Sequence, residues 1–413
     1  MRIAVVVGTR PEFIKTWSVV KEIKRRSNLE LVLIHTGQHY DYEMSQVFFE
    51  ELSLEKPDFF LEVGAQPVVE QSTAVMKKLS DVLLREKIDF VLVQGDTNSC
   101  LSAAIVTAQL RIPLGHIEAG CRSFDRTMPE EFNRIVIDSI ANLLFAPSEV
   151  AFQNLMREGH TRNRVLLAGN TAVDALNEGL RILSSPKEGL EKPYCVITIH
   201  RAGNTDNPAR LSEILKALRD LKMKCIFPIH PRTRKMIKEF DMEDLLLSSN
   251  LEIIAPLGYL SFLNLIRNAS LVLTDSGGVQ EEAALLSVHT ITIRENTEWP
   301  ETVWAGINHL AHADAREIIQ IADTIQKNSK PQIGSIYKGD AGKNIVDLIV
   351  SRMLNEEMEY KIPDMIKSGY PILGLVDRDD SSALMRFDKN GKTIFEGKAK
   401  YSIIEKYRPL EKE

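Results

Sequence analysis

The chain has 413 residues, of which 44% are hydrophobic and 26% are charged, a composition typical of a folded globular protein. This length exceeds what one hydrophobic core usually organises, so we expect two domains. Lys and Arg total 51 against 57 Asp and Glu, which gives a formal net charge of -6. This balance excludes a broad basic surface for nucleic acid, so any phosphate binding must be local.

The first residues and the cysteines indicate a cytosolic protein. The run from Met1 to Gly8 is short, apolar and followed by charge, so we interpret it as a first strand rather than a signal peptide. No uncharged apolar run reaches the roughly 18 residues that predict a membrane span. The four cysteines lack metal-ligand spacing, which favours buried, reduced thiols; they are Cys100, Cys121, Cys195 and Cys225.

Short runs rich in Val, Ile and Leu alternate with segments of helical periodicity, which is the pattern of parallel sheets covered by helices. In the first half of the chain, the predicted strands are residues 2–7, 29–35, 90–94, 114–118, 144–146 and 165–168. In the second half, they are residues 194–200, 225–229, 251–254, 271–275 and 290–294.

A polar, turn-forming break at residues 184–189 separates the two series, and we place a domain boundary there. We therefore expect an α/β fold in which two doubly wound, Rossmann-like domains face each other across a cleft. The Asn390-Gly391 pair predicts a hairpin in a small β-rich tail. The predicted division is residues 1–183 for the first domain, 190–340 for the second, 341–358 for a helix that returns to the first domain, and 359–413 for the tail.

The first candidate site follows the first strand. In open parallel sheets, ligands lie beyond the carboxyl ends of the strands. Gly8 permits a tight turn and Pro11 suits the first helical turn, so Arg10 and Lys15 would project toward an anion at the start of the helix. A helix cap with solvated charges explains the same residues equally well.

Three carboxylates gather after the next strands. Asp96 follows strand 90–94, Glu118 ends strand 114–118, and Glu130 opens the helix after a polar loop. A lone Asp in such a place is more often a helix cap, and three carboxylates can form an ordinary surface. A cluster at one sheet edge is nevertheless what acid–base chemistry at carbon requires.

Basic residues follow two strands of the second half. His200 and Arg201 end the first of these strands and suit a phosphate or a leaving group, whereas the alternative is a core histidine with a surface Arg. His230, followed by Arg232 and Arg234, repeats the arrangement one strand later. We expect these residues to face the acidic cluster across the cleft.

The strand at 271–275 leads through Ser276, Gly277 and Gly278 into a helix. Free backbone amides and a hydroxyl in this place can hold a diphosphate without a P-loop lysine, and Glu282 would bind ribose hydroxyls. The alternative is a tight turn with an acidic first helical turn. Gly-x-Gly-x-x-Gly, Walker and zinc patterns are absent from the sequence, so we predict no NAD, ATP or metal cofactor.

Six motifs occur in the order found in one enzyme family, at residues 8–12, 94–97, 116–120, 129–134, 169–171 and 275–282. The set resembles the non-hydrolysing UDP-N-acetylglucosamine 2-epimerases and spans residues 1 to about 353. Any one motif is weak, but the ordered set is highly specific. The resemblance implies a fold like that of the GT-B glycosyltransferases, with UDP held mainly by the second domain.

The resemblance also implies a reaction, the interconversion of UDP-N-acetylglucosamine and UDP-N-acetylmannosamine. The C2 proton is not acidic enough for direct removal, so this family eliminates UDP to an unsaturated sugar and adds it back with the opposite configuration at C2. Asp96, Glu118 and Glu130 would handle protons, in roles that are not assigned individually, and His200 completes the predicted catalytic set. The predicted substrate-binding residues are Arg10, Lys15, Phe262, Ser276, Gly277, Gly278 and Glu282.

Four residues match part of a second site, at which some bacterial members bind an activating substrate molecule: Gln38, His39, Arg201 and His230. The resemblance further implies a cytoplasmic homodimer that takes a UDP-sugar and has no nucleic-acid partner or membrane insertion.

The chain also departs from the family pattern. Ser139 stands where the family commonly has His, Gly203 where it usually has Glu, and Trp299 where Arg is expected. These departures are compatible with a modified sugar substrate or weak activity. The alternatives to a non-hydrolysing epimerase are a hydrolysing relative that releases N-acetylmannosamine, a glycosyltransferase on the same fold, and an inactive nucleotide-sugar sensor.

Overall fold

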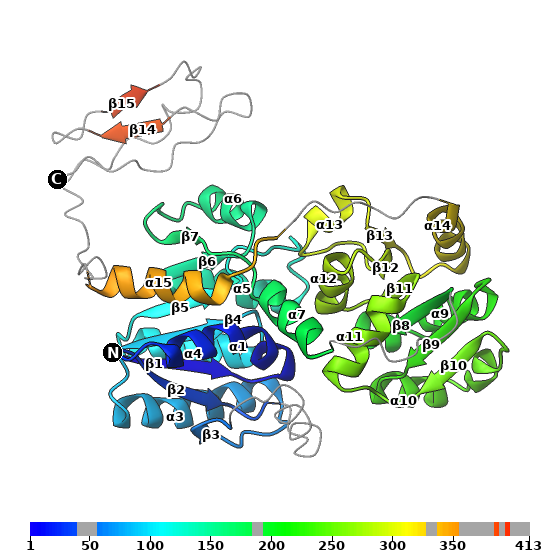
Figure 1. Cartoon of the computed structure of the whole chain (residues 1–413), viewed down its shortest axis with the longest axis horizontal. Coiled ribbons are helices and arrows are strands. Elements are labelled where there is room, and N and C mark those ends of the chain that lie inside the picture. The colour runs from blue at the N-terminus through cyan, green and yellow to red at the C-terminus, as the bar shows by residue number, and fades with distance from the viewer. Residues whose placement is uncertain (39–55, 184–192, 328–336, 355–383, 388–392, 397–413) are drawn as a thin grey trace, which may run out of the picture. The chain divides into compact units, whose positions relative to one another are not determined.

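A computed structural model describes residues 1–38, 56–183, 193–327, 337–354, 384–387 and 393–396 (Figure 1). The chain divides into two compact units, Met1–Ser351 and Arg352–Glu413. The first unit contains two parallel sheets, each covered by helices, which confirms the α/β class and the Rossmann-like pattern of each half. The predicted boundary at residues 184–189 lies outside the described residues, and the finer domain division stays a prediction.

The first sheet has seven parallel strands in the order β3-β2-β1-β4-β5-β6-β7. Its strands are β1 (Arg2–Val7), β2 (Glu30–His35), β3 (Phe59–Phe60), β4 (Phe90–Gln94), β5 (Leu114–Ile117), β6 (Leu143–Ala146) and β7 (Val165–Leu167). The helices between them are α1 (Arg10–Arg25), α3 (Val68–Arg85), α4 (Asn98–Gln109), α5 (Pro129–Ile140), α6 (Glu149–Arg157) and α7 (Thr171–Ile182).

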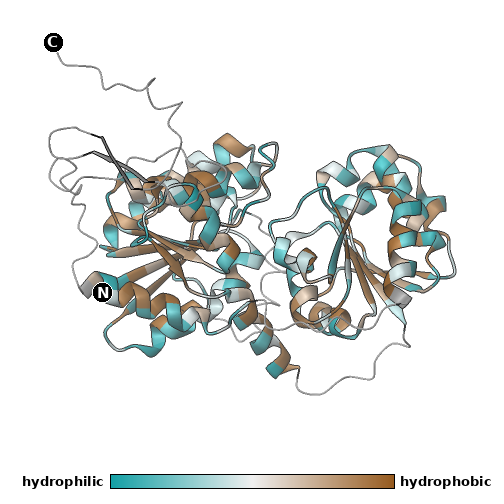
Figure 2. Cartoon of the chain, turned by 90° about the horizontal axis from the view of Figure 1, so that it is seen from above, coloured by the Kyte–Doolittle hydropathy of each residue, from teal (hydrophilic) through white to brown (hydrophobic). Residues whose placement is uncertain are grey.

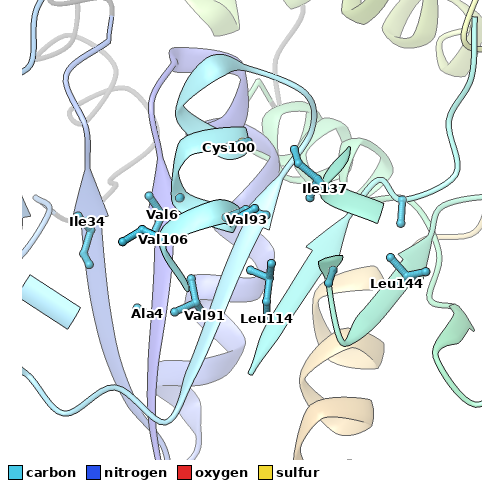
Figure 3. Close-up of a cluster of buried hydrophobic side chains, with 14 of the residues drawn as sticks. Ala4, Val6, Ile34, Val91, Val93, Cys100, Val106, Leu114, Ile137 and Leu144 are labelled. Carbon is cyan, nitrogen blue, oxygen red and sulfur yellow. The ribbon is translucent and has the colours of Figure 1, made fainter. Parts of the chain in front are cut away.

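The core of the first sheet forms because successive residues of a buried strand point to opposite faces, and both faces here are apolar. Ala4 and Val6 of β1 pack on one face with α3, α4 and α5. Figure 3 shows this cluster, with Cys100 of α4 and Ile137 of α5 among its labelled side chains. The other face receives α1, which packs against β1 and β2.

The second sheet has six parallel strands in the order β10-β9-β8-β11-β12-β13. Its strands are β8 (Tyr194–Thr198), β9 (Lys224–Pro228), β10 (Leu251–Ile254), β11 (Leu271–Thr274), β12 (Thr290–Ile293) and β13 (Asn308–Ala311). Its helices are α8 (Ala202–Thr205), α9 (Pro208–Asp220), α10 (Pro231–Glu239), α11 (Tyr259–Asn268), α12 (Gly277–Leu285), α13 (Pro300–Trp304) and α14 (Ala315–Lys327), with a 3-10 turn, η1, at Glu243–Leu246.

Both faces of the second sheet are also buried. Cys195 and Ile197 of β8 lie in a cluster with α9 and α14, whereas Tyr194 and Val196 of the same strand lie in a cluster with α11 and α12. Figure 2 shows the apolar strands of each sheet with helices of mixed polarity around them. All four cysteines are buried and free, and burial raises the pKa of Cys100, Cys121 and Cys195. The expectation of buried, reduced thiols is therefore confirmed.

One helix and two strands lie beyond the second sheet in sequence. Helix α15 (Ala341–Leu354) contacts the first half, because the Gly342 amide donates to Asp174 at 2.8 Å and Arg26 forms an ion pair with Asp347 at 2.5 Å. Strands β14 (Leu384–Phe387) and β15 (Thr393–Glu396) pair antiparallel, as the hairpin pattern predicts. The Asn390-Gly391 turn itself lies outside the described residues.

The strand predictions hold to within one or two residues at each end, but the predicted strands omit β3 and β13. Strand β3 has two residues, too few for a periodicity to show. Strand β13 begins with Asn308 and His309, polar residues that do not indicate a strand. Both lie at sheet edges, where pairing to one neighbour suffices. Within the described residues, no helix is both long and apolar enough to cross a bilayer.

We predict that Gly120→Ala destabilises the protein strongly. Gly120 has a φ of +82°, and an added Cβ would lie 2.2 Å from the backbone oxygen of Ala151. The variant should lose more than about 2 kcal/mol of unfolding free energy, because the cost of the left-handed backbone and the cost of the clash add together. Urea unfolding followed by circular dichroism measures this loss.

Gly64→Ala is the matched control, because Gly64 has a φ of +72° but an added Cβ there would meet nothing within 4 Å. It should lose only about 1 kcal/mol, the cost of the backbone conformation alone. Equal losses in the two variants would contradict the predicted clash.

Candidate active site

Asp96 and Glu118 lie at the same edge of the first sheet. Strands β4 and β5 are parallel neighbours, with Gln94 paired to Ile117, and the two carboxylates follow the ends of these strands. Glu118 has a φ of +68°, which is unusual for a residue with a side chain and marks a tight turn after β5. The structure thus places the two acidic residues at the sheet edge that the sequence indicates.

Helix α5 holds Asp96 from one side. Arg134 donates to the Asp96 carboxylate at 2.5 Å, and the Asn133 amide donates to the Asp96 carbonyl at 2.8 Å. Arg134 is buried and also pairs with Glu131 at 2.8 Å and with Glu298 at 3.1 Å. Burial alone would lower the pKa of Arg134, but the surrounding carboxylates raise it well above its ordinary value. Asp96 is therefore fixed against a permanent positive charge.

Glu130 and Glu131 differ in burial and in hydrogen-bond partners, although they are neighbours in the first turn of α5. Glu131 is buried, and its carboxylate accepts hydrogen bonds from the amides of Ser123 and Phe124, so it shapes the loop before the helix. Glu130 is half-buried and, among the described residues, no group hydrogen-bonds or pairs with its carboxylate. Of these two residues, Glu130 is the one available to a substrate.

Lys15 lies between two carboxylates. Its ammonium contacts Glu118 and lies 3.0 Å from Glu281 Oε2. It also lies 5.6 Å from the centre of the Trp299 ring. Burial alone would lower the pKa of Lys15, but Glu118 and Glu281 raise it well above its ordinary value. Lys15 was predicted to face an anion, and in this structure the anions are protein carboxylates.

Glu281 is a site residue that the sequence did not single out. It is fully buried on α12, and the Asn170 amide donates to it at 2.6 Å. Burial raises its pKa to about 7. Its neighbour Glu282, the predicted ribose ligand, is half-buried, and burial followed by the charge of Glu281 raises its pKa to about 7 as well.

A buried glutamate of α1 holds the loop that precedes this helix. Glu12 is buried and accepts hydrogen bonds from the amides of Gly8 at 2.5 Å and Thr9 at 3.1 Å, so it closes a capping box with Thr9. Burial raises the pKa of Glu12 to about 7 against these hydrogen bonds. Arg10 projects from this loop and donates to the carbonyl of Leu257 at 3.5 Å.

In the second half, one buried carboxylate orients the basic residues. Asp275 accepts the backbone amide of His200 at 3.1 Å and that of Arg201 at 3.0 Å. The His200 ring lies with its Nδ1 3.4 Å from Asp275 and remains 39% exposed. The rings of His200 and His230 lie 5.5 Å apart. The predicted pairing of two basic strand ends is therefore present, with Asp275 as its anchor.

Helix α12 begins beside these residues. Ser276 caps it by accepting the Val279 amide at 3.4 Å. An added Cβ on Gly278 would meet nothing within 4 Å, and one on Gly277 would lie 3.7 Å from Glu298. Open space therefore lies beside Gly278, in the first turn of the helix, where an anionic ligand could approach.

Glu298 is a second site residue that the sequence did not single out. It forms ion pairs with Arg294 at 2.7 Å, with Arg134 at 3.1 Å and with Arg201 at 3.8 Å. Burial alone would raise its pKa, but Arg294 and Arg134 lower it to about 2. Its carboxylate thus joins Arg134, which holds Asp96, to the arginines of the second half.

The predicted activator residues fall into two places. Gln38 is buried and accepts from the Ser99 amide and hydroxyl at the start of α4, whereas Arg201 and His230 lie beside His200. His230 also caps α10 by accepting the Arg232 amide at 3.1 Å. His39 lies outside the described residues.

The departures from the family pattern differ in surroundings. Ser139 is exposed on α5, and an added Cβ on Gly203 would meet nothing within 4 Å. Trp299 is buried and packs edge-on against Tyr337, with ring centres 5.7 Å apart. Phe262, on α11, is half-buried against the apolar cluster of that helix. Of the three departures, Trp299 is the one that touches a predicted site residue, Lys15.

Comparison with known proteins identifies the family. The sequence pattern of UDP-N-acetylglucosamine 2-epimerases matches residues 21–350. The UDP-N-acetylglucosamine 2-epimerase of Methanococcus maripaludis is 42% identical to this chain over 361 residues, which cover 84% of this chain and 98% of the relative. The chain belongs to the UDP-N-acetylglucosamine 2-epimerase family.

Two further members of the epimerase family support this assignment and differ in the sugar for which they are named. The crystal structure of Methanocaldococcus jannaschii UDP-GlcNAc 2-epimerase in complex with UDP-GlcNAc and UDP superposes with a TM-score of 0.80 at 41% identity, covering 85% of this chain and 100% of that chain. The UDP-2,3-diacetamido-2,3-dideoxy-D-glucuronate 2-epimerase of Pseudomonas aeruginosa is 39% identical, covering 82% of this chain and 96% of the relative. The chain is an enzyme of this family, whose members differ in the sugar they use.

We predict that Glu12 makes stability depend on pH. Because burial raises its pKa from about 4.5 to about 7, the folded chain binds this proton more tightly than the unfolded chain. The stabilisation is complete below about pH 4.5 and is lost as the pH rises through about 7. The non-ionising variant Glu12→Gln should therefore gain stability relative to the wild type over this range, by up to about 3 kcal/mol.

Urea unfolding at several pH values measures the Glu12 effect. Glu70→Gln, an exposed substitution on α3, is the control for the chemical change itself. A constant difference between Glu12→Gln and the wild type across this pH range would contradict the prediction.

Proposed function

We propose that the protein interconverts UDP-N-acetylglucosamine and UDP-N-acetylmannosamine by elimination and re-addition of UDP. The observation that carries this proposal is the pair of carboxylates, Asp96 and Glu118, at the ends of adjacent strands, with Lys15 against Glu118. The open space beside Gly278 at the start of α12 supports a site for the diphosphate at this helix N-terminus. Family membership and the ligands named for the M. jannaschii structure support the same reaction.

The elimination removes the C2 proton and breaks the bond between C1 and the diphosphate oxygen, giving an unsaturated sugar and UDP. Re-addition delivers a proton to the opposite face of C2 while UDP bonds again to C1. A group must therefore accept a proton on one face of the sugar and another must donate on the other. We assign these tasks to Asp96, Glu118 and Glu130 as a set.

The leaving diphosphate needs positive charge and hydrogen-bond donors. We assign the backbone of Ser276, Gly277 and Gly278 to cradle it, and His200 and Arg10 to stabilise its charge. Glu282 would hold the ribose and Phe262 would line the substrate site. Lys15 contacts Glu118, so a positive charge lies against one of the proposed proton-handling groups.

A modified UDP-sugar is the second candidate substrate. The buried Trp299 touches Lys15, and the P. aeruginosa relative is named for a diacetamido glucuronate rather than for UDP-N-acetylglucosamine. A homodimer, a cytoplasmic location and an activating second site at Gln38, His39, Arg201 and His230 remain predictions from the family resemblance.

Proton NMR of the protein with UDP-N-acetylglucosamine in deuterated water tests the reaction. We expect UDP-N-acetylmannosamine with deuterium at C2. Free N-acetylmannosamine with UDP would replace the proposal by a hydrolysing epimerase. An unchanged spectrum would reject UDP-N-acetylglucosamine as the substrate; turnover of a diacetamido UDP-sugar would then identify the second candidate, and binding alone would indicate a sensor.

We predict that Asp96→Asn and Glu118→Gln each lower kcat at least about 100-fold, because each removes a group that transfers or receives a proton. UDP binding, measured by calorimetry, should persist, since the diphosphate is assigned to α12. Asp81→Asn, an exposed carboxylate-to-amide change on α3, is the matched control. Near-normal kcat in both site variants would contradict the assignment of these carboxylates.

A further inference from the structure

A histidine without an assigned role lies directly behind the two carboxylates. His116 is on β5 and is fully buried. Its Nδ1 lies 2.6 Å from Asp138 Oδ1, and its Nε2 lies 2.9 Å from the carbonyl oxygen of Gly95. Gly95 precedes Asp96, so the ring contacts the loop that carries one of the proposed proton-handling groups.

Both ring nitrogens of His116 therefore face oxygen acceptors. A neutral imidazole has one N–H and can donate to one of them alone, whereas an imidazolium donates to both. The carbonyl of Gly95 has no proton to offer. Consequently either His116 carries both protons, or Asp138 is protonated and donates to Nδ1.

The surroundings of Asp138 favour the first arrangement. Its second oxygen accepts from Arg122 at 2.6 Å and from the Gly120 amide at 3.1 Å, as an ionised carboxylate would.

Other charged groups face this cluster from neighbouring elements. Arg122 pairs with Glu158, an exposed residue, at 2.6 Å in addition to Asp138. Arg164 donates to the backbone carbonyl of Asp138 at 3.3 Å. Burial lowers the pKa of nearby His160. Asp138 is the carboxylate that contacts the His116 ring.

The cluster reaches both loops of the proposed site. His116 holds the carbonyl of Gly95, whose φ is +77°, and Asp138 holds the amide of Gly120, whose φ is +82°. We propose that His116 is a positioning residue, an imidazolium that donates to Asp138 and Gly95 and fixes the loops of Asp96 and Glu118 relative to each other. The positioning role rests on the proposed function for these two carboxylates, whereas the charge of His116 does not.

Nitrogen-15 NMR of the histidine-labelled, full-length protein tests the charge without any substrate. The His116 signals are identified by their loss in His116→Gln. We expect both ring nitrogens to carry protons at about pH 7, because each faces an oxygen acceptor. Exposed His312, which also pairs with a carboxylate, is the internal comparison. One unprotonated nitrogen in His116 would overturn the proposal.

His116→Phe tests the positioning role. The phenyl ring takes the place of the imidazole but cannot donate to Gly95 or to Asp138, while Asp138 keeps its contacts with Arg122 and Gly120. We expect kcat to fall about 10- to 100-fold while KM stays within about threefold, because the carboxylates are displaced and the diphosphate site is untouched. His312→Gln should leave both constants unchanged.

Two outcomes separate this inference from the proposed function. If the wild type does not epimerise UDP-N-acetylglucosamine, hydrogen exchange at residues 94–98 and 117–121 replaces kcat as the readout, and faster exchange in His116→Phe supports the positioning role. Unchanged exchange and kcat in a folded His116→Phe protein would overturn it.

Discussion

A charge that is buried away from water must have a fixed opposite charge within reach, and this constraint organises the loops above the first sheet. Arg134 has Asp96, Glu131 and Glu298 around it, and Lys15 has Glu118 and Glu281. Removing a single partner would strand a charge in a region that cannot solvate it. Asp96, Glu118, Glu281 and Glu298 are therefore held in place by the same interactions that keep the protein folded.

These ion pairs also join residues of the two halves of the chain. Glu298 lies between β12 and α13 of the second half, yet it shares Arg134 with Asp96 of the first. Glu281, on α12, shares Lys15 with Glu118. Ion pairs thus connect the residues assigned to the sugar, in the first half, with residues of the second half that lie near the proposed diphosphate site.

Much of this arrangement could be predicted from the sequence, because strand periodicity and the parallel connection place the carboxyl ends of strands at one edge. That reasoning locates Asp96, Glu118, His200 and the turn at Ser276. It cannot locate Glu281 or Glu298, because their importance depends on partners more than 100 residues away in the chain. The sequence predicts Lys15 as a site residue, but its carboxylate partners depend on tertiary contacts that local patterns do not encode.

Helix α15 has a consequence for how the chain reaches this structure. Its residues Ile345 and Ile349 are fully buried, and its first turn lies against Ser18 of α1. The helix follows the whole of the second sheet in sequence, so it leaves the ribosome after that sheet has been synthesised. The first half of the nascent chain must therefore wait with part of its apolar surface uncovered while the second half emerges. Translation order thus makes the earliest residues among the last to complete their packing.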